Sequence, residues 1–564
     1  MAKDQKPPKV LLLGLDGATW DLMLPWIEAG QLPNLARLQQ QGSWGNLAST
    51  LQPVTAPAWV SFMTGMNQGK HNLYDFVRRR AGSYDLELTN ASMVQAPTLF
   101  DHLSRVGRRV ACVNMPFTFP PRPLNGVMVS GLFATVVDES ITYPHTFFQT
   151  LKQITPQYAI NPDYKSQAAT PLATYLQDLL NSIDERTKVV EHLLQTEPWD
   201  LLAVVYTATD QVQHAFWHCL PDAEVPAAYQ SHPQRFGEAI LQVYQRIDAA
   251  IGRLLTQIDE ETIVVVMSDH GAGPLRRWVQ LNRWLANEGF LTFKGAAATG
   301  QRGRKASLIN QAASAYKRLL PDSLRRTIRA RLGARFYDLK ARMETEMFTA
   351  TVEWSQTRAY SLGACGNIFI NLQGREPQGT VPAAEYETVR SEIATRLATL
   401  QDPDTGQPLV RCVHRREDVY SGPYLENAPD LLIEWADYSY WGRGRFDVDS
   451  PDVLETRHHW DFSELPLTGT HRPQGIFIIQ GTPIQSAAEL TGARLIDVLP
   501  TILYLMGLPL PSGLDGRVLA EAFTNPPESI PTETTDTLLD QEKYGYSAED
   551  SALIEQRLKE LGYL

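Results

Sequence analysis

Acidic and histidine side chains follow three apolar segments of the chain, each at the point where the segment ends. Asp16 comes directly after the first segment, Asp210 and His214 follow the second, and Asp269 and His270 follow the third. Carboxylates and imidazoles together are the oxygen and nitrogen ligands that zinc and manganese prefer in proteins. These residue types predict a site for divalent cations, with several carboxylates to offset the charge of two adjacent ions.

Each of these residues also has a simpler interpretation. An aspartate after a strand is more often the N-cap of a helix than a ligand, and Asp210 could cap the helix that carries His214. However, residues four apart on a helix face the same way, so Asp210 and His214 can act together. Asp269 and His270 are followed by Gly271, a small neighbour that lets the backbone bring both side chains to one centre. The recurrence of the pattern at three places favours the metal site.

Thr55 is the candidate nucleophile for hydrolytic chemistry at such a site. It lies between Pro53 and Pro57, in a constrained turn before a helical segment that we expect to begin near Ala58. A hydroxyl close to a helix N-terminus lies where the peptide dipole favours an anion, and a bound cation would hold it as an alkoxide. The spacing leaves an alternative open, namely that Thr55 only caps the helix.

The elements that must position these side chains are short apolar strands. Residues 9–15 (KVLLLGL), 201–206 (LLAVVY) and 262–267 (TIVVVM) are continuous apolar runs, typical of strands buried on both faces of a parallel sheet, and residues 475–480 (GIFIIQ) are a fourth candidate. Residues 237–258 have the apolar spacing of an amphipathic helix. Strands alternating with helices predict an α/β fold, with a doubly wound, mostly parallel central sheet and helices on both faces. Because ligands bind beyond the carboxyl ends of parallel strands, the three acidic segments should meet at one edge.

The composition is that of an ordinary soluble globular protein. The chain has 564 residues, of which 43% are hydrophobic and 20% charged. A formal net charge of -12 argues against a nucleic-acid partner. We expect a cytoplasmic location because there is no membrane-length apolar run, no secretory signal at the start and no closely spaced cysteine pair among four cysteines.

Two segments depart from the strand and helix alternation. Residues 294–342 carry thirteen Lys and Arg against two Asp, with an apolar stripe that predicts a basic amphipathic helix. This insertion is either a helical segment with a solvated charged face, or a lid and docking surface for an anionic substrate or an anionic membrane surface. Near the end, residues 522–540 are typical of a linker, and residues 547–564 of a terminal helix. We therefore expect a catalytic α/β domain in two parts, 9–290 and 346–520, a basic helical insertion at 291–345, and a linker with a C-terminal helix at 521–564.

Five motifs in this order resemble the alkaline phosphatase superfamily, and most closely its type I phosphodiesterase and nucleotide pyrophosphatase branch. They are GLDG at residue 14, TAPAWVSFMTG at 55, DQVQH at 210, SDHG at 268 and THRPQGIF at 470. The closing stretch of residues 496–516 is similar to the one found in this superfamily and in its sulfatase relatives. The resemblance covers residues 9–519 and implies an alkaline phosphatase-like fold.

The resemblance also implies a role for each matching residue. Thr55 is the implied nucleophile, attacking phosphorus to give a phospho-threonyl intermediate that water then hydrolyses. Of the candidates for the last ligand, His471 is preferred over His458 and His459 because it directly precedes the apolar run 475–480. The implied ligands of one cation are Asp16, Thr55, Asp269 and His270, and those of the other are Asp210, His214 and His471. Zn²⁺ is the expected ion at both positions, and Mn²⁺ fits the same ligands.

One position departs from the nucleotide pyrophosphatase pattern. That branch has an Asn that donates to a phosphate oxygen 21 residues after the nucleophile, and Phe76 stands there in this chain. Lys70 and residues 78–80 (RRR) are nearby cations that could replace it, although a solvated basic run is the simpler interpretation of the arginines. The pattern is closer to a cytoplasmic group described only as phosphohydrolases or phosphomutases.

The expected function is therefore a metal-dependent phosphohydrolase or phosphodiesterase that acts on a small-molecule phosphate ester or diester. A phosphomutase or phosphotransferase is an alternative, since it would use the same site and pass the phosphoryl group to a second hydroxyl. A binding protein that keeps the fold without turnover is a third hypothesis, but it predicts lost ligands and all seven positions are filled. The chain has no Cys-x-Pro-x-Arg element, which argues against sulfatase chemistry.

Overall fold

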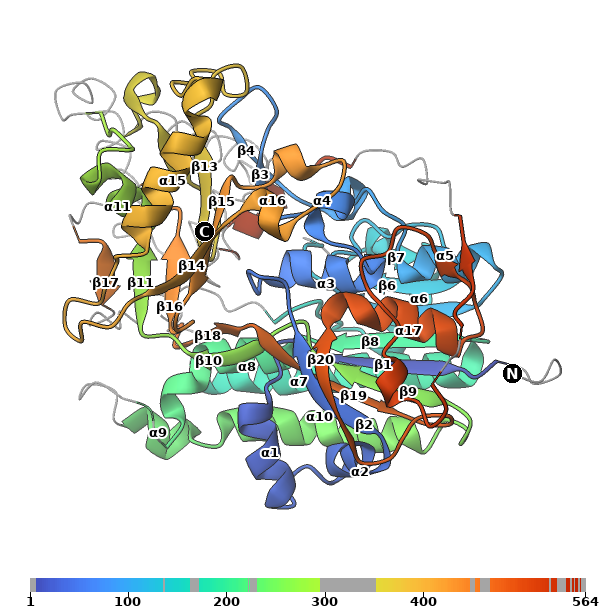
Figure 1. The fold of residues 1–564 in the computed structure, drawn as a ribbon. Coiled ribbons are helices and arrows are strands. Elements are labelled where there is room, and N and C mark those ends of the chain that lie inside the picture. Colours follow the sequence, from blue (N-terminus) through green and yellow to red (C-terminus); the bar gives the residue numbers. More distant parts are fainter. Residues whose placement is uncertain are drawn as a thin grey trace, which may run out of the picture.

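The fold is described from a computed structural model (Figure 1). It describes residues 7–294 apart from 135–136, 163–171, 222 and 224–230, and residues 351–558 apart from 447–451, 457–466, 527–528, 535–543, 548–549, 552 and 556–557. The basic insertion at 294–342 lies almost wholly outside these residues, as do His458 and His459. Among the described helices, none combines the length and the apolar character that crossing a bilayer requires.

A nine-stranded sheet forms the centre of the molecule, in the order β20-β2-β19-β9-β1-β8-β5-β6-β7. The three apolar runs 9–15, 201–206 and 262–267 are confirmed as its central strands. Side chains of β1, β8 and β9 are buried along their whole length, as strands covered on both faces must be. The strands are β1 (Val10–Leu15), β2 (Ser43–Ala48), β5 (Val110–Met115), β6 (Gly126–Ser130), β7 (Thr142–Tyr143), β8 (Leu201–Tyr206), β9 (Ile263–Met267), β19 (Gln474–Gln480) and β20 (Ala488–Arg494).

The sheet is mostly parallel, with one reversed strand, β19, inside it and another, β7, at its edge. β1 pairs in parallel with β8 and β9, and β5 pairs in parallel with β6 and β8. The fourth apolar run forms β19, which pairs antiparallel with both β9 and β2. An apolar run does not reveal strand direction, so the reversal was not visible in the sequence. It matters for the site because β19 brings its preceding residues to the carboxyl ends of its neighbours.

Helices cover both faces of the sheet (Figure 1). α7, α8 and α10 pack against one another on one face, and α3, α5 and α17 pack together on the other. The predicted helix at 237–258 is confirmed as α10, with Ile240, Val243, Ile247, Ile251 and Leu254 buried. The helices are α1 (Trp20–Glu28), α2 (Pro33–Gln41), α3 (Thr55–Thr64), α4 (Gln68–His71), α5 (Leu99–Arg105), α6 (Phe147–Ile154), α7 (Leu172–Thr196), α8 (Ala208–Phe216), α9 (Ser231–Phe236), α10 (Ala239–Leu255) and α17 (Val498–Leu505).

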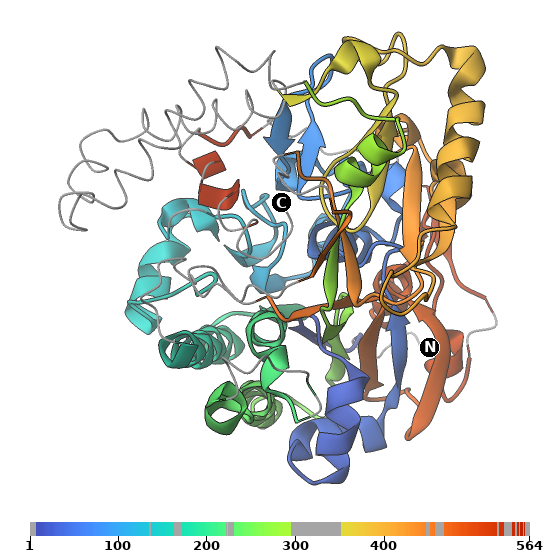
Figure 2. The same ribbon diagram turned by 90° about the vertical axis from the view of Figure 1, so that its left-hand side faces the viewer.

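A smaller group of sheets stands beyond the carboxyl end of the central strands (Figures 1 and 2). One has the order β12-β13-β15-β14 and another β16-β11-β17, and α15 packs on the first. β10 and β18 form a two-stranded ladder next to the central sheet. The bounds are β3 (Val77–Arg79), β4 (Leu86–Leu88), β10 (Gly271–Pro274), β11 (Arg277–Gln280), β12 (Ala359–Ser361), β13 (Asn367–Ile370), β14 (Val410–Arg415), β15 (Leu431–Trp435), β16 (Tyr440–Arg443), β17 (Leu454–Thr456), β18 (Gly469–Arg472), β21 (Leu510–Pro511), β22 (Thr532–Glu533), α11 (Leu281–Asn287), α15 (Tyr386–Leu397) and α16 (Arg416–Val419).

The end of the chain returns to the body of the protein. The hydroxyl of Ser547 accepts from the backbone N–H of Asp550, as expected where a helix begins, and Ile554 and Leu558 are buried. The linker at 522–540 lies partly outside the described residues. The division of the chain at residues 290, 345 and 520 stays a prediction.

Candidate active site

The three acidic segments meet at one edge of the central sheet. Asp16 directly follows β1, Asp210 lies in the first turn of α8 after β8, and Asp269 and His270 follow β9. Leu15, at the end of β1, is in register with Tyr206, at the end of β8, and Gly14 is in register with Met267, at the end of β9. Parallel pairing therefore brings side chains about 250 residues apart in sequence to one place.

Asp16, Asp269 and His270 form the first cluster of buried ligand atoms, all within 4.8 Å of one another. The indole N–H of Trp59 donates to Asp16 Oδ2 at 3.1 Å, and the backbone N–H of Gly17 donates to Asp269 Oδ1 at 3.2 Å. The second oxygen of each carboxylate is buried and accepts no hydrogen bond from the described residues. Asp16 Oδ1 and Asp269 Oδ2 instead face His270 Nε2, at 3.8 and 3.2 Å. Buried carboxylate oxygens without donors are what a cation site requires.

Asp210, His214 and His471 form the second cluster, again with ligand atoms within 4.8 Å of one another. Asp210 Oδ1 lies 3.2 Å from His214 Nε2 and 3.4 Å from His471 Nε2. The two Nε2 atoms are 3.0 Å apart. His471 lies on β18, which pairs with β10 and so joins the segment after His270 to this cluster. The rings of His270 and His471 stack with centroids 3.6 Å apart, so the two clusters adjoin.

Backbone carbonyls assign the tautomers of all three histidines. His214 Nδ1 lies 2.8 Å from the carbonyl oxygen of Gly469, and His471 Nδ1 lies 2.6 Å from that of Pro53. His270 Nδ1 lies 3.0 Å from its neighbour's carbonyl oxygen. Since a carbonyl only accepts, each Nδ1 carries the proton and donates it, which directs the lone pair of each Nε2 into the clusters. This is how metal-binding histidines are oriented in proteins.

Thr55 reaches the first cluster from the N-terminal end of α3. Its Oγ1 lies 3.2 Å from His270 Nε2. The helix begins at Thr55 rather than near Ala58, because a proline in the first turn, here Pro57, removes an N–H that has no partner inside the helix. The N-cap residue is Val54, without a side-chain cap, so Thr55 does not play the capping role that the sequence left open.

Three carboxylates are buried here without a Lys or Arg within 4.0 Å in the described part of the chain. Burial, and then the charge of Asp210, raise the pKa of Asp16 to about 8. Burial and Asp16 also raise the pKa of Asp269. Burial alone would raise the pKa of Asp210 too, but His214 and His471 lower it well below its usual range. Keeping all three carboxylates ionised at pH 7 therefore needs positive charge from another source.

The cations considered for substrate binding lie in ion pairs outside these clusters. Lys70 Nζ contacts Asp515 Oδ1 at 2.5 Å and the carbonyl oxygen of Gly513 at 2.8 Å. Arg78 pairs with Glu87, and Arg79 pairs with Glu376. These contacts give the basic residues structural partners.

Phe76 occupies an apolar environment rather than a polar one. It is buried with Phe117 and Phe133, whose ring centroids lie 6.1 and 5.2 Å from its own. The position at which the resembling branch has a hydrogen-bond donor is therefore part of an aromatic cluster in this protein.

Several groups that position the site were not identified from the sequence. Trp59 could have been found, because it lies four residues after Thr55 and hence on the same face of α3. The carbonyl oxygens of Pro53 and Gly469 could not, because every residue carries a carbonyl and only the folded chain shows which ones meet a histidine.

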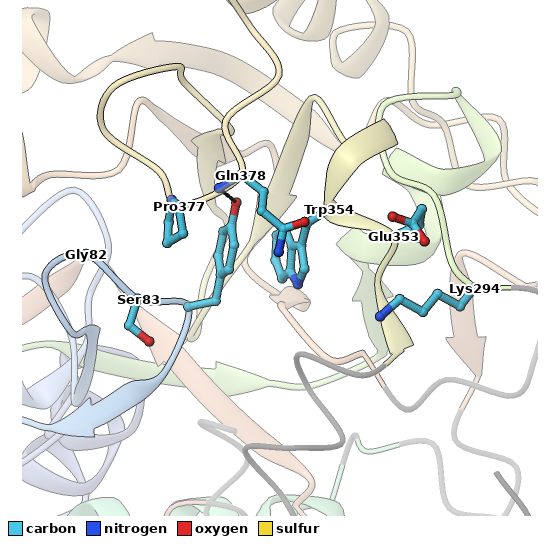
Figure 3. A pocket seen from close by; sticks show the side chains of 8 residues that line it. Gly82, Ser83, Lys294, Glu353, Trp354, Pro377 and Gln378 are labelled. Carbon is cyan, nitrogen blue, oxygen red and sulfur yellow. Dashed lines mark hydrogen bonds between the residues drawn. The ribbon is translucent and has the colours of Figure 1, made fainter. Parts of the chain in front are cut away.

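A cavity beside the β3–β4 turn is lined by none of the residues of the two clusters (Figure 3). It has a volume of about 260 Å³ and is lined by the β3–β4 turn, which includes Tyr84, and by residues outside the strands, among them Lys294, Glu353 and Gln378. Tyr84 stacks on Trp354 with ring centroids 3.7 Å apart. None of the predicted site residues lines this cavity.

Comparison with known structures places the fold. The phosphonoacetate hydrolase of Sinorhizobium meliloti 1021, solved with phosphonoformate, is 15% identical in sequence and superposes with a TM-score of 0.50 over 89% of this chain and 96% of its own. Murine ectonucleotide pyrophosphatase / phosphodiesterase 5 is 12% identical, with a TM-score of 0.45 over 89% of this chain and 95% of its own. The alkaline phosphatase-like α/β architecture predicted from the sequence is thus confirmed.

The fold and the family define a phosphoric ester hydrolase. Residues 10–461 match the family model of type I phosphodiesterases / nucleotide pyrophosphatases, and the chain belongs to that family. A sequence comparison with curated proteins finds no significant match.

Proposed function

We propose that this protein cleaves a small phosphate mono- or diester with Thr55 as nucleophile, at a centre of two divalent cations. The first cation would be held by Asp16, Thr55, Asp269 and His270, and the second by Asp210, His214 and His471. The observation that carries the proposal is the adjacency of two buried ligand clusters with a threonine hydroxyl 3.2 Å from one of them.

The residues fit such a pair of ions in charge and in chemistry. Three buried carboxylates have no Lys or Arg beside them within the described residues, and each histidine presents Nε2 to a cluster. Nitrogen and carboxylate ligands suit Zn²⁺, with Mn²⁺ as the second choice. When bound, the cations would lower the pKa of the Thr55 hydroxyl and of a water molecule, and would offset the charge of the phosphoryl oxygens.

The chain supplies the other parts of the mechanism. Thr55 Oγ1 attacks phosphorus, the bond to the leaving-group oxygen breaks, and that oxygen takes up a proton to leave as an alcohol. Water then hydrolyses the phosphorylated Thr55 to the free hydroxyl, releasing phosphate from a monoester substrate or a phosphate monoester from a diester. Because Thr55 is the first residue of α3, the helix dipole favours the negative charge that gathers there. The carbonyl oxygens that hold Nδ1 of His214, His270 and His471 keep the ligands oriented before the substrate arrives. Lys70, whose ammonium group pairs with Asp515, is the proposed cation for a phosphate oxygen of the substrate.

A cytoplasmic location is part of the proposal. The four cysteines Cys112, Cys219, Cys365 and Cys412 are free thiols, as expected in a reducing compartment.

The test is a comparison of Thr55→Ala with Thr64→Ala, in protein loaded with Zn²⁺ or Mn²⁺. Thr64 lies at the other end of α3, where its hydroxyl donates to Val60, so its variant removes the same group away from the clusters. Activity is measured on an aryl phosphate monoester and on a diester, and metal content by elemental analysis. We expect Thr55→Ala to lose at least about 1000-fold in kcat, and Thr64→Ala to keep activity within a few fold.

The proposal also predicts a covalent species and a metal content. Rapid acid quenching of wild-type protein during turnover should trap phosphate on Thr55, detected by mass spectrometry, with about two metal ions per chain. An alcohol acceptor added to the assay separates hydrolysis from phosphoryl transfer by the ratio of free phosphate to transferred phosphate. Substantial turnover by Thr55→Ala would contradict the assigned nucleophile.

A further inference from the structure

Two consecutive side chains of α7 hold the junction between β8 and α8. Arg186 Nη1 donates to Thr207 Oγ1 at 3.1 Å, and the hydroxyl groups of Thr187 and Tyr206 share a hydrogen bond of 2.9 Å. Tyr206 is the last residue of β8, and Thr207 is the residue before the first turn of α8. Asp210 follows three residues later, in that first turn. The turn that directs the second cluster is therefore attached to α7, which packs on α8 (Figure 1).

Arg186 is a buried cation whose hydrogen bonds go to neutral oxygen atoms. It is 0% exposed, and it also donates to the carbonyl oxygen of Ile160 and to Asn161 Oδ1, the latter at 3.5 Å. The adjacent carboxylate of Glu185 instead accepts from the backbone N–H of Ala159 at 3.1 Å. Within the part of the chain that the structure describes, Arg186 forms no ion pair. An enclosed guanidinium without a carboxylate is costly, and an apolar side chain would serve packing alone at lower cost, which indicates a further role for its N–H groups.

Thr207 uses its hydroxyl in this network rather than as a helix cap. It is the N-cap residue of α8, yet its side chain accepts from no backbone N–H of this helix, whose residues are all described. A threonine at an N-cap usually makes that bond. Here Oγ1 donates to Asn161 Oδ1 at 2.7 Å and accepts from Arg186. Because hydrogen bonds from a charged donor are roughly twice as strong as neutral ones, the guanidinium is a firm anchor for the start of α8.

The same junction also contacts the first cluster. The Thr209 hydroxyl donates to the carbonyl oxygen of Asp16 at 2.6 Å, and the backbone N–H of Asp16 donates to the carbonyl oxygen of Tyr206 at 3.1 Å. Residues 206–209 thus contact α7 and Asp16 at once. Their position determines how far Asp210 lies from Asp16, and hence how the second cluster stands relative to the first.

We infer that Arg186 is a positioning residue of the second cluster. Through Thr207 it sets the start of α8, so that Asp210 and His214, four residues apart on one face, meet His471. The inference rests on the proposed function, in which this cluster holds the second cation. Loss of a group that orients metal ligands lowers metal affinity by about 10–100-fold. Removing Arg186 should therefore weaken the second ion and leave the first, whose carboxylates follow β1 and β9, nearly unchanged.

Competition titration of the metal-free full chain with Zn²⁺ and a chromophoric chelator tests the inference without measuring activity. It gives one affinity for each of the two ions, and His471→Ala identifies the second ion as the one that this variant loses. We expect Arg186→Met and Thr207→Val to weaken that ion at least about 10-fold and the first ion less than about 3-fold. Thr207→Ser keeps the hydroxyl, so it should bind both ions like the wild type. Arg253→Met is the matched control, because it removes another contact of α7, the ion pair with Glu191 at the surface.

Thr207→Val covers the case in which Arg186→Met does not fold, since it removes one hydroxyl and no charge. A general loss of stability would weaken both ions alike, so a loss confined to the second ion and restored in Thr207→Ser distinguishes positioning from support of the fold. Unchanged affinity in both variants would overturn the inference, as would equal weakening of the two ions or a Thr207→Ser protein no better than Thr207→Val. Failure of the proposed function would appear in the wild type itself, as fewer than two bound ions, and would overturn this inference with it. Failure of the inference alone appears only in the variants.

Discussion

The Nε2 atoms of His214 and His471 lie 3.0 Å apart, although the Nδ1 atom of each ring is hydrogen bonded to a backbone carbonyl. Two neutral rings held in this way direct their lone pairs at each other, which is unfavourable unless a proton or a cation lies between them. Asp210 beside them raises the pKa of His214 against the effect of burial, which favours a positive charge between the two rings. The protein is therefore built around a positive charge at this point.

Removing metal should lower the melting temperature of the protein. A cation that binds only the folded state stabilises that state by about 2.7 kcal/mol when its free concentration is 100 times its Kd, because unfolding must release the ion. Differential scanning fluorimetry of chelator-treated protein, with and without added Zn²⁺, measures the shift. We expect a shift of several degrees in the wild type and a clearly smaller one in His471→Ala. Equal shifts in both proteins would place the bound ion elsewhere.

Trp59→Phe should weaken metal binding while preserving most of the packing. The substitution keeps a buried aromatic ring beside Phe62 but removes the indole N–H that donates to Asp16 Oδ2. Loss of a group that orients a ligand lowers metal affinity by about 10–100-fold. A competition titration with a chromophoric chelator gives the affinity of each protein. Unchanged affinity would show that Asp16 is held in place without this hydrogen bond.

Two glycines after His270 should tolerate a methyl group to very different degrees. A Cβ at Gly271 would lie 2.1 Å from the carbonyl oxygen of Gln474, a backbone atom that cannot move without shifting β19. A Cβ at Gly273 would instead meet the guanidinium end of Arg472, which can rotate away. We expect Gly271→Ala to cost about 2–3 kcal/mol and Gly273→Ala about 1 kcal/mol in urea unfolding. The reverse order would contradict the backbone pairing at this site.

The stability of the protein should fall as the pH is lowered below 6.5, partly because of His71. This residue is fully buried, where its ring nitrogens contact the Ser61 hydroxyl and the N–H of Leu73, and burial lowers its pKa to about 3. Below the pKa of the histidine in the unfolded chain, the unfolded chain binds a proton at this ring and the folded protein does not. The contribution of the neutral ring to the free energy of unfolding is therefore fully present above that pKa and is lost as the pH falls below it. The expected cost between pH 7 and pH 5 is about 2 kcal/mol.

Urea unfolding at several pH values checks this dependence. His71→Gln has no titrating ring, so the difference in stability between wild type and variant should shrink by about 2 kcal/mol from pH 7 to pH 5. A difference that stays constant over this range would exclude His71 as the cause.

The parts of the fold that were predicted from the sequence are those in which burial produces a local pattern of apolar residues. Runs such as residues 201–206 favour central strands, and where these strands are parallel the polar residues after them lie at one edge of the sheet. β5 was not predicted although it pairs with β8, because VACVNM is short and interrupted by small and polar residues. The smaller sheets contain strands of three to six residues whose register depends on distant partners. Such pairings are not visible in any local pattern.

Within the candidate site, residue types were easier to predict than geometry. The carboxylates and histidines follow strands, and the order of the motifs favoured His471 over His458 and His459. The helix start at Thr55 was misplaced by three residues because prolines on both sides obscure where the first turn begins. The tautomers of His214 and His471 and the donors to Asp16 and Asp269 depend on contacts across more than 40 residues of sequence, so they required the structure.

The pairing of Ala272 with His471 has a consequence for how the protein matures. Ribosomes make the segment with Asp16 first and begin β18 453 residues later (469 − 16), so a nascent chain can assemble the first cluster well before the second has its final ligand. Binding of the proposed second ion would therefore wait until β18 has emerged and joined β10. The order of synthesis keeps the proposed catalyst incomplete until most of the chain has been made.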